Sequence, residues 1–152
     1  MSTDINVRGW GAVTTLGWSA PESAKNLIEG KVLPAKAGEV SHLISPEFKS
    51  FAVPYDGDPL SKSQKMLEAA LDEAIERAGL SHAEIAESSL FVGTTGGLFI
   101  RNEYEFTEEV RRHPGKESPP ISCRNRGPGE VTQVIAGKYG IKGMTFTLSM
   151  AC

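Results

Sequence analysis

The sequence predicts an α/β protein in which helices pack on a mixed or largely parallel sheet. Helical and strand patterns alternate along the chain, and glycines follow most of the predicted elements. One short apolar strand also runs through a glycine turn directly into a helix, which is typical of this class. The 152 residues are 39% hydrophobic and 23% charged, an ordinary composition for a globular domain. We expect one domain over residues 1–152, without internal repeats or a linker.

The first predicted element is a strand over residues 5–16. Its apolar residues are separated by Gly9 and Gly11, which would allow another backbone to approach closely. Ser19 then caps a predicted helix that ends at Gly30.

Residues 31–59 contain four prolines and are predicted to be irregular, either as a partner-facing excursion or as a plain surface loop. The clearest predicted helix covers residues 60–78 and ends at Gly79. Residues 81–84 then form a capping box for a short helix. The apolar stripe of the long helix consists of Met66, Leu67, Ala70, Leu71, Ala74, Ile75 and Ala78.

A short buried strand is predicted over residues 89–92, followed by a glycine turn over 93–97 and a helix over 98–112. The turn lacks the spacing of a dinucleotide-binding or phosphate-binding loop. We therefore expect its backbone to pass close to another chain or to an acyl group rather than to bind phosphate.

The remaining sequence predicts an irregular stretch over residues 113–126, a helix over 129–139 and a last strand over 144–152. This strand would place the thiol of Cys152 at its tip, where a nucleophile is often found. The other interpretation, which uses no family information, is a generic α/β domain whose cysteine is a small buried hydrophobe.

Charge and residue counts exclude several functions. The net charge of −3 gives no electrostatic reason to expect nucleic-acid binding, and no apolar run is long enough to span a membrane. The N-terminus lacks signal-peptide features, so we expect a cytoplasmic protein.

Cys123 and Cys152 are too few and too distant for a zinc site, and a disulfide is not expected in the cytosol. His42, His82 and His113 are expected at the surface.

Three motifs in the same order resemble the β-ketoacyl synthase family of the thiolase superfamily. They are the opening Thr-Thr-Leu-Gly of residues 14–17, the Phe-Val-Gly-Thr-Thr-Gly-Gly of residues 91–97, and Tyr-Gly-Ile-Lys-Gly over 139–143 followed by Ser-Met-Ala-Cys over 149–152. The resemblance covers essentially the whole chain. It implies the N-terminal half of a thiolase-like fold, with the C-terminal half absent from this chain.

The resemblance also implies an activity. Cys152 would be the catalytic nucleophile of an acyltransferase that performs a decarboxylating Claisen condensation of its acyl-cysteine with a malonyl unit. Both substrates would arrive on the phosphopantetheine of an acyl carrier protein, and no cofactor is expected. Thr95, Gly96, Leu98 and Phe99 are the candidates for lining the acyl tunnel.

The chain departs from the common family pattern. Met150 stands where the family most often has threonine before Ala-Cys, the glycine turn over 93–97 looks one residue shorter than in the common chain-elongating enzymes, and residues 31–59 lack the long basic and glycine-rich stretch of many members. These departures favour a divergent member of a secondary-metabolite, polyketide-type pathway over housekeeping fatty-acid synthesis. The paired catalytic histidines, or His and Asn, belong to the second half in this family, so the isolated chain is not expected to be active. Basic residues that could recognise a carrier are Lys62, Lys65, Arg124 and Arg126.

The resemblance further implies a dimer, formed either by two synthases or by a synthase and a chain-length factor. The strand over residues 145–150 looks apolar on both faces and would pair across the two-fold axis. The alternative function is that of a non-catalytic, chain-length-factor-like subunit that partners an active synthase. The retained Cys152 favours the catalytic role.

Overall fold

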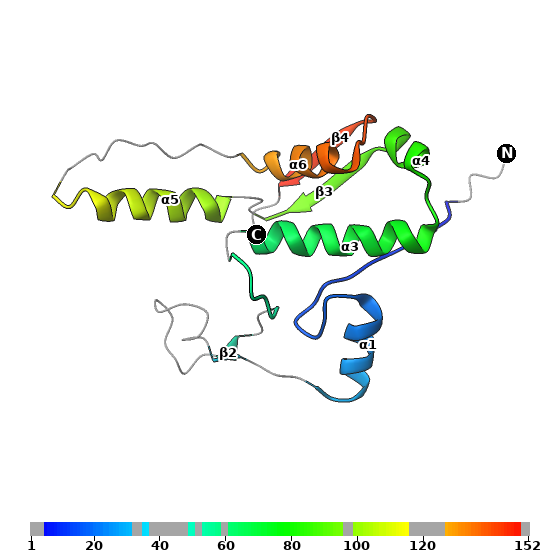
Figure 1. Ribbon diagram of the computed structural model, residues 1–152, viewed down its shortest axis with the longest axis horizontal. Helices are drawn as coiled ribbons and strands as arrows, with labels where there is room; N and C mark the ends of the chain where they lie inside the picture. Colours follow the sequence, from blue (N-terminus) through cyan, green and yellow to red (C-terminus); the bar gives the residue numbers. More distant parts are fainter. Residues whose placement is uncertain are drawn as a thin grey trace. The chain divides into compact units, whose positions relative to one another are not determined.

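A computed structural model describes most of the chain. The described residues are 5–31, 35–36, 49–50, 53–58, 61–95, 99–115 and 127–149. The chain divides into two compact units, residues 1–80 and 81–152, and each is considered by itself. Figure 1 shows the helices and strands of both units.

In the described residues of the first unit there are two helices and a minimal antiparallel strand pair. Ser19 caps the first helix as predicted, because its Oγ accepts the N–H of Glu22 at 3.3 Å. Gly79, with a φ of 61°, ends the long helix in the left-handed conformation that glycine adopts easily. The elements are α1 (Ala20–Ile28), β1 (Ala35–Lys36), β2 (Lys49–Ser50) and α3 (Lys62–Ala78). The β1–β2 pair lies within the stretch that was predicted to be irregular.

The predicted opening strand over residues 5–16 is wrong. This segment forms no strand in the structure, and its one bridge joins Thr14 to Gly17 within a tight turn. The segment runs along α3 instead, and a Cβ on Gly9 or Gly11 would collide with the helix backbone at Ala74 or Ala70. The predicted close backbone approach is therefore present, but its partner is a helix rather than a strand.

The described part of the second unit consists of a two-stranded parallel sheet and three helices. Ser81 and Glu84 form the predicted capping box, with each residue's side chain accepting from the backbone of the other. Gly140, with a φ of 68°, ends the helix before the last strand. The elements are α4 (His82–Glu87), β3 (Leu90–Thr94), α5 (Phe99–Arg112), α6 (Glu130–Tyr139) and β4 (Thr145–Ser149).

The core of the second unit lies between α6 and the sheet. Figure 1 shows α6 beside β3 and β4. Val92 of β3 is buried, and α6 buries Val131, Ile135 and Ala136, of which Ile135 is completely inaccessible to solvent. This arrangement confirms the mixed α/β class, with a helix packed on a parallel strand pair.

The prediction that the last strand is apolar on both faces is wrong. Alternate residues of β4 point to opposite faces. Phe146 and Leu148 are on one face, whereas Thr145, Thr147 and Ser149 bring hydroxyl groups to the face that contacts α6. The sequence correctly indicated a strand with apolar residues here. The error came from treating the threonines, which are common in strands, as if their face of the strand were apolar.

Candidate functional site

The carboxyl ends of β3 and β4 meet at one edge of the second unit. The two strands are parallel, with Leu90 opposite Thr145 at their start and Thr94 opposite Ser149 at their end. Parallel strands leave their sheet in the same direction, and binding groups in open α/β sheets gather outside these ends. The edge therefore brings together Thr94 of the first motif and Ser149, the first residue of the last motif, although about fifty positions separate them in the sequence.

The proposed nucleophile follows this edge. Cys152 lies outside the described residues, three positions beyond Ser149. An extended chain spans at most about 3.6 Å per residue, so covalent geometry alone limits the separation of these two Cα atoms to about 11 Å.

The tunnel candidates belong to the connection between β3 and α5. Thr95 directly follows β3 and is exposed. Phe99 is the first residue of α5, but its side chain lies outside the described part, as do Gly96 and Leu98 entirely. The structure thus places the beginning and end of this connection, and the role of the four residues in the tunnel remains a prediction.

A pair of threonine hydroxyls, one buried and one half-buried, joins α6 to β4 just before the edge. Thr132 Oγ1 lies 2.6 Å from Thr147 Oγ1, and Thr132 is 2% exposed. The N-cap residue of α6, Gly129, also approaches this strand, because a Cβ built on it would lie 3.7 Å from Thr147 Oγ1. Sequence reasoning missed this pair, since two threonines fifteen positions apart carry no motif.

The opposite face of the sheet carries exposed apolar side chains. Phe91 and Phe146 are in register, with ring centroids 6.3 Å apart, and 63% and 49% of their surfaces are exposed. Met144 and Leu148 are also more than half exposed. The two phenylalanines form a cross-strand aromatic pair on the face of β3–β4 that α6 does not cover.

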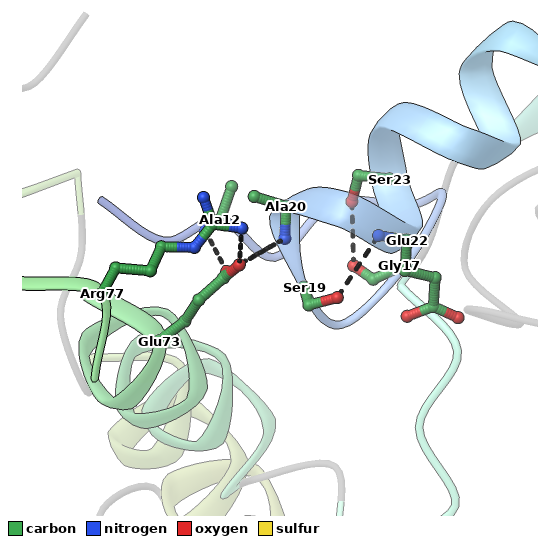
Figure 2. A network of polar contacts seen from close by, with 8 residues as sticks. All are labelled: Ala12, Gly17, Ser19, Ala20, Glu22, Ser23, Glu73 and Arg77. Carbon is green, nitrogen blue, oxygen red and sulfur yellow. Dashed lines mark hydrogen bonds and ion pairs between the residues drawn. The ribbon is translucent and has the colours of Figure 1, made fainter. Parts of the chain in front are cut away.

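A second organised site lies in the first unit and was also missed by sequence reasoning. Both carboxylate oxygens of Glu73 accept the N–H of Ala20, at 2.9 and 3.2 Å, and one of them accepts the N–H of Ala12 at 3.1 Å. Figure 2 shows this carboxylate pointing from α3 to both backbone groups, with the Arg77 guanidinium beside it. The ion pair between Glu73 and Arg77 measures 2.9 Å.

These contacts lower the pKa of Glu73. The hydrogen bond from Ala20 is the largest cause, and the hydrogen bond from Ala12 and the charge of Arg77 act in the same direction, while burial opposes them. Arg77 in turn lies over the Trp10 ring, 4.5 Å from its centroid. The network fixes residues 10–20 against α3, and no residue in it has the arrangement of a nucleophile and base.

The histidines and lysines singled out from sequence have ordinary surroundings where they are described. His82 is the exposed first residue of α4, as predicted. The ring of His113 lies 3.1 Å from the backbone oxygen of Glu109 at the end of α5. Lys65 pairs with Glu68 at 3.1 Å. Outside the described residues are His42, Cys123, Arg124 and Arg126.

Within the described ranges, no group of three or more His, Cys, Asp or Glu side chains is arranged to hold a metal ion. Over the same part of the chain, no helix has the length and apolar character needed to cross a membrane.

Comparisons with known proteins agree with the fold. The search of curated proteins found no match. Among solved structures, the chain resembles the ishigamide ketosynthase/chain length factor with a TM-score of 0.70 and 19% sequence identity. That match covers 94% of this chain and 39% of the other, so the chain spans about two fifths of the length of this structural neighbour.

The family model of the β-ketoacyl synthase N-terminal domain matches residues 2–152. It therefore extends over both units and includes the edge formed by β3 and β4. The resemblance inferred from the three motifs is confirmed, and the chain belongs to the β-ketoacyl synthase family.

Proposed function

We propose that this chain is the nucleophile-bearing N-terminal part of a ketosynthase that forms carbon–carbon bonds on carrier-bound acyl chains. The reaction is a decarboxylating Claisen condensation in polyketide-type or fatty-acid-type biosynthesis. The observation that carries the proposal is the register of the parallel pair, with Thr94 opposite Ser149. This register brings the start of the 95–99 connection and the strand leading to Cys152 to one edge.

In the first half-reaction, the Cys152 thiolate attacks the thioester carbonyl of an acyl group on a carrier. A new bond forms between Sγ and the acyl carbon, and the bond to the phosphopantetheine sulfur breaks, releasing that sulfur as a thiolate. Backbone N–H groups around the edge would stabilise the oxyanion that forms in between.

In the second half-reaction, a malonyl thioester on a carrier loses its carboxylate as CO2. The electron pair of the broken bond becomes an enolate, whose carbon attacks the acyl-cysteine carbonyl. The product is a β-ketoacyl thioester on the carrier, and the Cys152 thiolate leaves unchanged. The balance requires no redox step and no cofactor.

We propose that the connection after β3 contributes to the acyl tunnel. Thr95, Gly96, Leu98 and Phe99 would line the acyl tunnel near the nucleophile. Thr95 directly follows Thr94, whose register partner leads toward Cys152. The short distance along the chain from Thr94 to these residues, and from Ser149 to Cys152, supports their role in the tunnel more strongly than the presence of apolar residues among them alone.

We propose that catalysis needs a C-terminal half as well. The matched family domain is an N-terminal domain, and the structural neighbour is considerably longer than this chain. The groups that promote decarboxylation, and the helix that would favour the thiolate at its N-terminus, would belong to that part. The proposed partners are an acyl carrier protein and a second ketosynthase-type subunit, in the cytoplasm.

A second candidate function is that of a chain-length-factor-like subunit without its own catalysis. It is favoured by the name of the structural neighbour, which combines a ketosynthase and a chain length factor. The two candidates differ in whether the thiol of Cys152 takes part in bond formation.

The test uses the complete protein, together with its partner subunit if one co-purifies. Iodoacetamide labelling is followed by peptide mass spectrometry, and condensation is measured with acyl and malonyl carrier proteins. We expect labelling at Cys152, its suppression by prior acylation, and complete loss of product in Cys152→Ala. The Cys123→Ala variant, which removes the other cysteine, should keep both properties.

Product formation that survives Cys152→Ala, in a complex that loses activity when this protein is withdrawn, would support the chain-length-factor role instead. An unlabelled Cys152 and unchanged product in the variant would overturn the catalytic proposal.

A further inference from the structure

We infer that Thr132 and Thr147 act as a positioning pair that holds the end of β4 in place for the nucleophile. The inference rests on the proposed function, because it concerns the placement of Cys152. It adds two residues that neither touch the reacting atoms in the proposal nor belong to the three motifs that carry the resemblance.

Thr132 of α6 is nearly inaccessible to solvent, whereas Thr147 of β4 is half-buried. Thr132 is 2% exposed, and its hydroxyl is 2.6 Å from that of Thr147. A buried hydroxyl without a partner is costly, so the buried Thr132 hydroxyl favours keeping this contact. A hydrogen bond is directional, whereas the burial of the apolar Val131 and Ile135 on the same helix has no preferred direction.

The choice of residue in α6 supports a specific role. Threonine is a poor helix former because its β-branch restricts the side chain, and valine of nearly equal shape would fill the same space. A threonine hydroxyl in a helix commonly bonds back to the preceding turn. Here the Thr132 hydroxyl contacts a neighbouring strand instead.

Thr147 is held from two sides. Its backbone is part of the parallel ladder, opposite Val92 of β3, and its side chain is joined to α6. The N-terminus of α6 is close as well, since a Cβ on Gly129 would be in contact with Thr147 Oγ1. These contacts fix β4 two residues before Ser149 and five residues before Cys152.

The consequence concerns reaction geometry. A strand end that shifts along or away from the sheet carries the following residues with it. An error of about 1 Å in the placement of a reacting group can cost about 100-fold in rate. Loss of the hydroxyl contact should therefore slow the chemical step while leaving carrier binding unchanged.

The test replaces each threonine by valine and by serine in the complete protein. Valine keeps the volume and removes the hydroxyl, whereas serine keeps the hydroxyl. For Thr147→Val and Thr132→Val we expect kcat and the rate of iodoacetamide alkylation at Cys152 to fall about tenfold or more, with an unchanged KM for the acyl carrier. Both serine variants should retain a kcat close to that of the wild type.

Thr145→Val is the matched control. Thr145 is on the same face of the same strand but is exposed, so its hydroxyl should be dispensable for kcat and for alkylation. Urea unfolding of every variant separates a change of geometry from a loss of folded protein.

The outcomes distinguish the two proposals. If Cys152 is alkylated in the wild type and both valine variants keep the wild-type kcat, the positioning role is overturned and the catalytic proposal stands. If the wild type itself neither alkylates at Cys152 nor condenses acyl groups, both proposals fail. In both valine variants, kcat could also fall only in proportion to the fraction of unfolded protein. The pair would then contribute to stability alone, and the inference would be overturned.

Discussion

The Glu73 carboxylate accepts the backbone N–H of Ala20, 2.9 Å from Oε2, and so ties α3 to the first residue of α1. The N-terminal N–H groups of a helix lack partners within the helix and carry partial positive charge. Ser19 satisfies the N–H of Glu22 locally, and Glu73 reaches Ala20 from 53 positions away. Figure 2 shows the local cap and the distant carboxylate at the same helix end.

Replacing Glu73 by Gln should destabilise the first unit. The amide keeps the shape of the side chain but has a single acceptor oxygen and no charge for Arg77. We expect a lower midpoint in urea unfolding for Glu73→Gln than for Glu76→Gln, an exposed position on the same helix. Equal midpoints for the two variants would show that the carboxylate network contributes nothing to stability.

The same carboxylate should make stability depend on pH. Its pKa in the folded chain is below the ordinary value of 4.5, chiefly because of the hydrogen bond from Ala20. The unfolded chain then binds the proton more readily, so the stabilisation is present above pH 4.5 and is lost as the pH falls through the lower, folded pKa. Unfolding curves of the wild type and Glu73→Gln should therefore converge at acidic pH. A difference that grows on acidification would contradict this sign.

Local signals in the sequence predicted the helices well. The cap at Ser19, the capping box of Ser81 and Glu84, and the left-handed glycines at 79 and 140 each act within a few residues. The strand, turn and helix that follow Ser89 were also predicted, because a buried strand and a glycine turn are both recognisable from a few consecutive residues. The order of elements predicted a mixed or largely parallel sheet, and the structure shows which strands pair in it: β3 and β4 are parallel neighbours.

The features that were missed depend on contacts between distant residues. Residues 5–13 have the composition of a strand, but the N–H of Ala12 is bound by Glu73 and the Arg8 side chain donates to the backbone oxygen of Ala78. No local sequence pattern distinguishes a glutamate that accepts backbone N–H groups from a distant segment from one that is exposed to solvent. The Thr132–Thr147 pair was invisible for the same reason, since it depends on how α6 lies on β4.

Adding a methyl group at Gly11 should displace the opening segment. The new Cβ would collide with the backbone oxygen of Ala70 and lie 2.9 Å from the Glu73 Cβ. Overpacking of this kind typically costs about 1–3 kcal/mol, so we expect Gly11→Ala to lower the free energy of unfolding by this amount. The measurement is urea unfolding with circular dichroism.

Gly137→Ala is the control for Gly11→Ala. Gly137 lies within α6 with open space around its Cβ position. Alanine is favoured over glycine inside a helix by about 1 kcal/mol, so this variant should be slightly more stable than the wild type. A Gly11→Ala protein as stable as the wild type would show that the segment does not need its close approach to α3.

Removing the Ser81 hydroxyl should weaken α4. Its Oγ accepts the N–H of Glu84 at 3.3 Å, while Glu84 Oε2 accepts the N–H of Ser81 at 2.8 Å. Loss of an N-cap typically costs about 1 kcal/mol, which is the expected decrease for Ser81→Ala. Ser81→Asn keeps a side-chain acceptor at the cap and should recover most of the loss. Hydrogen exchange of the Glu84 amide reports the cap directly: faster exchange in the alanine variant alone is expected, and equal exchange in all three proteins would show that the hydroxyl does not cap the helix.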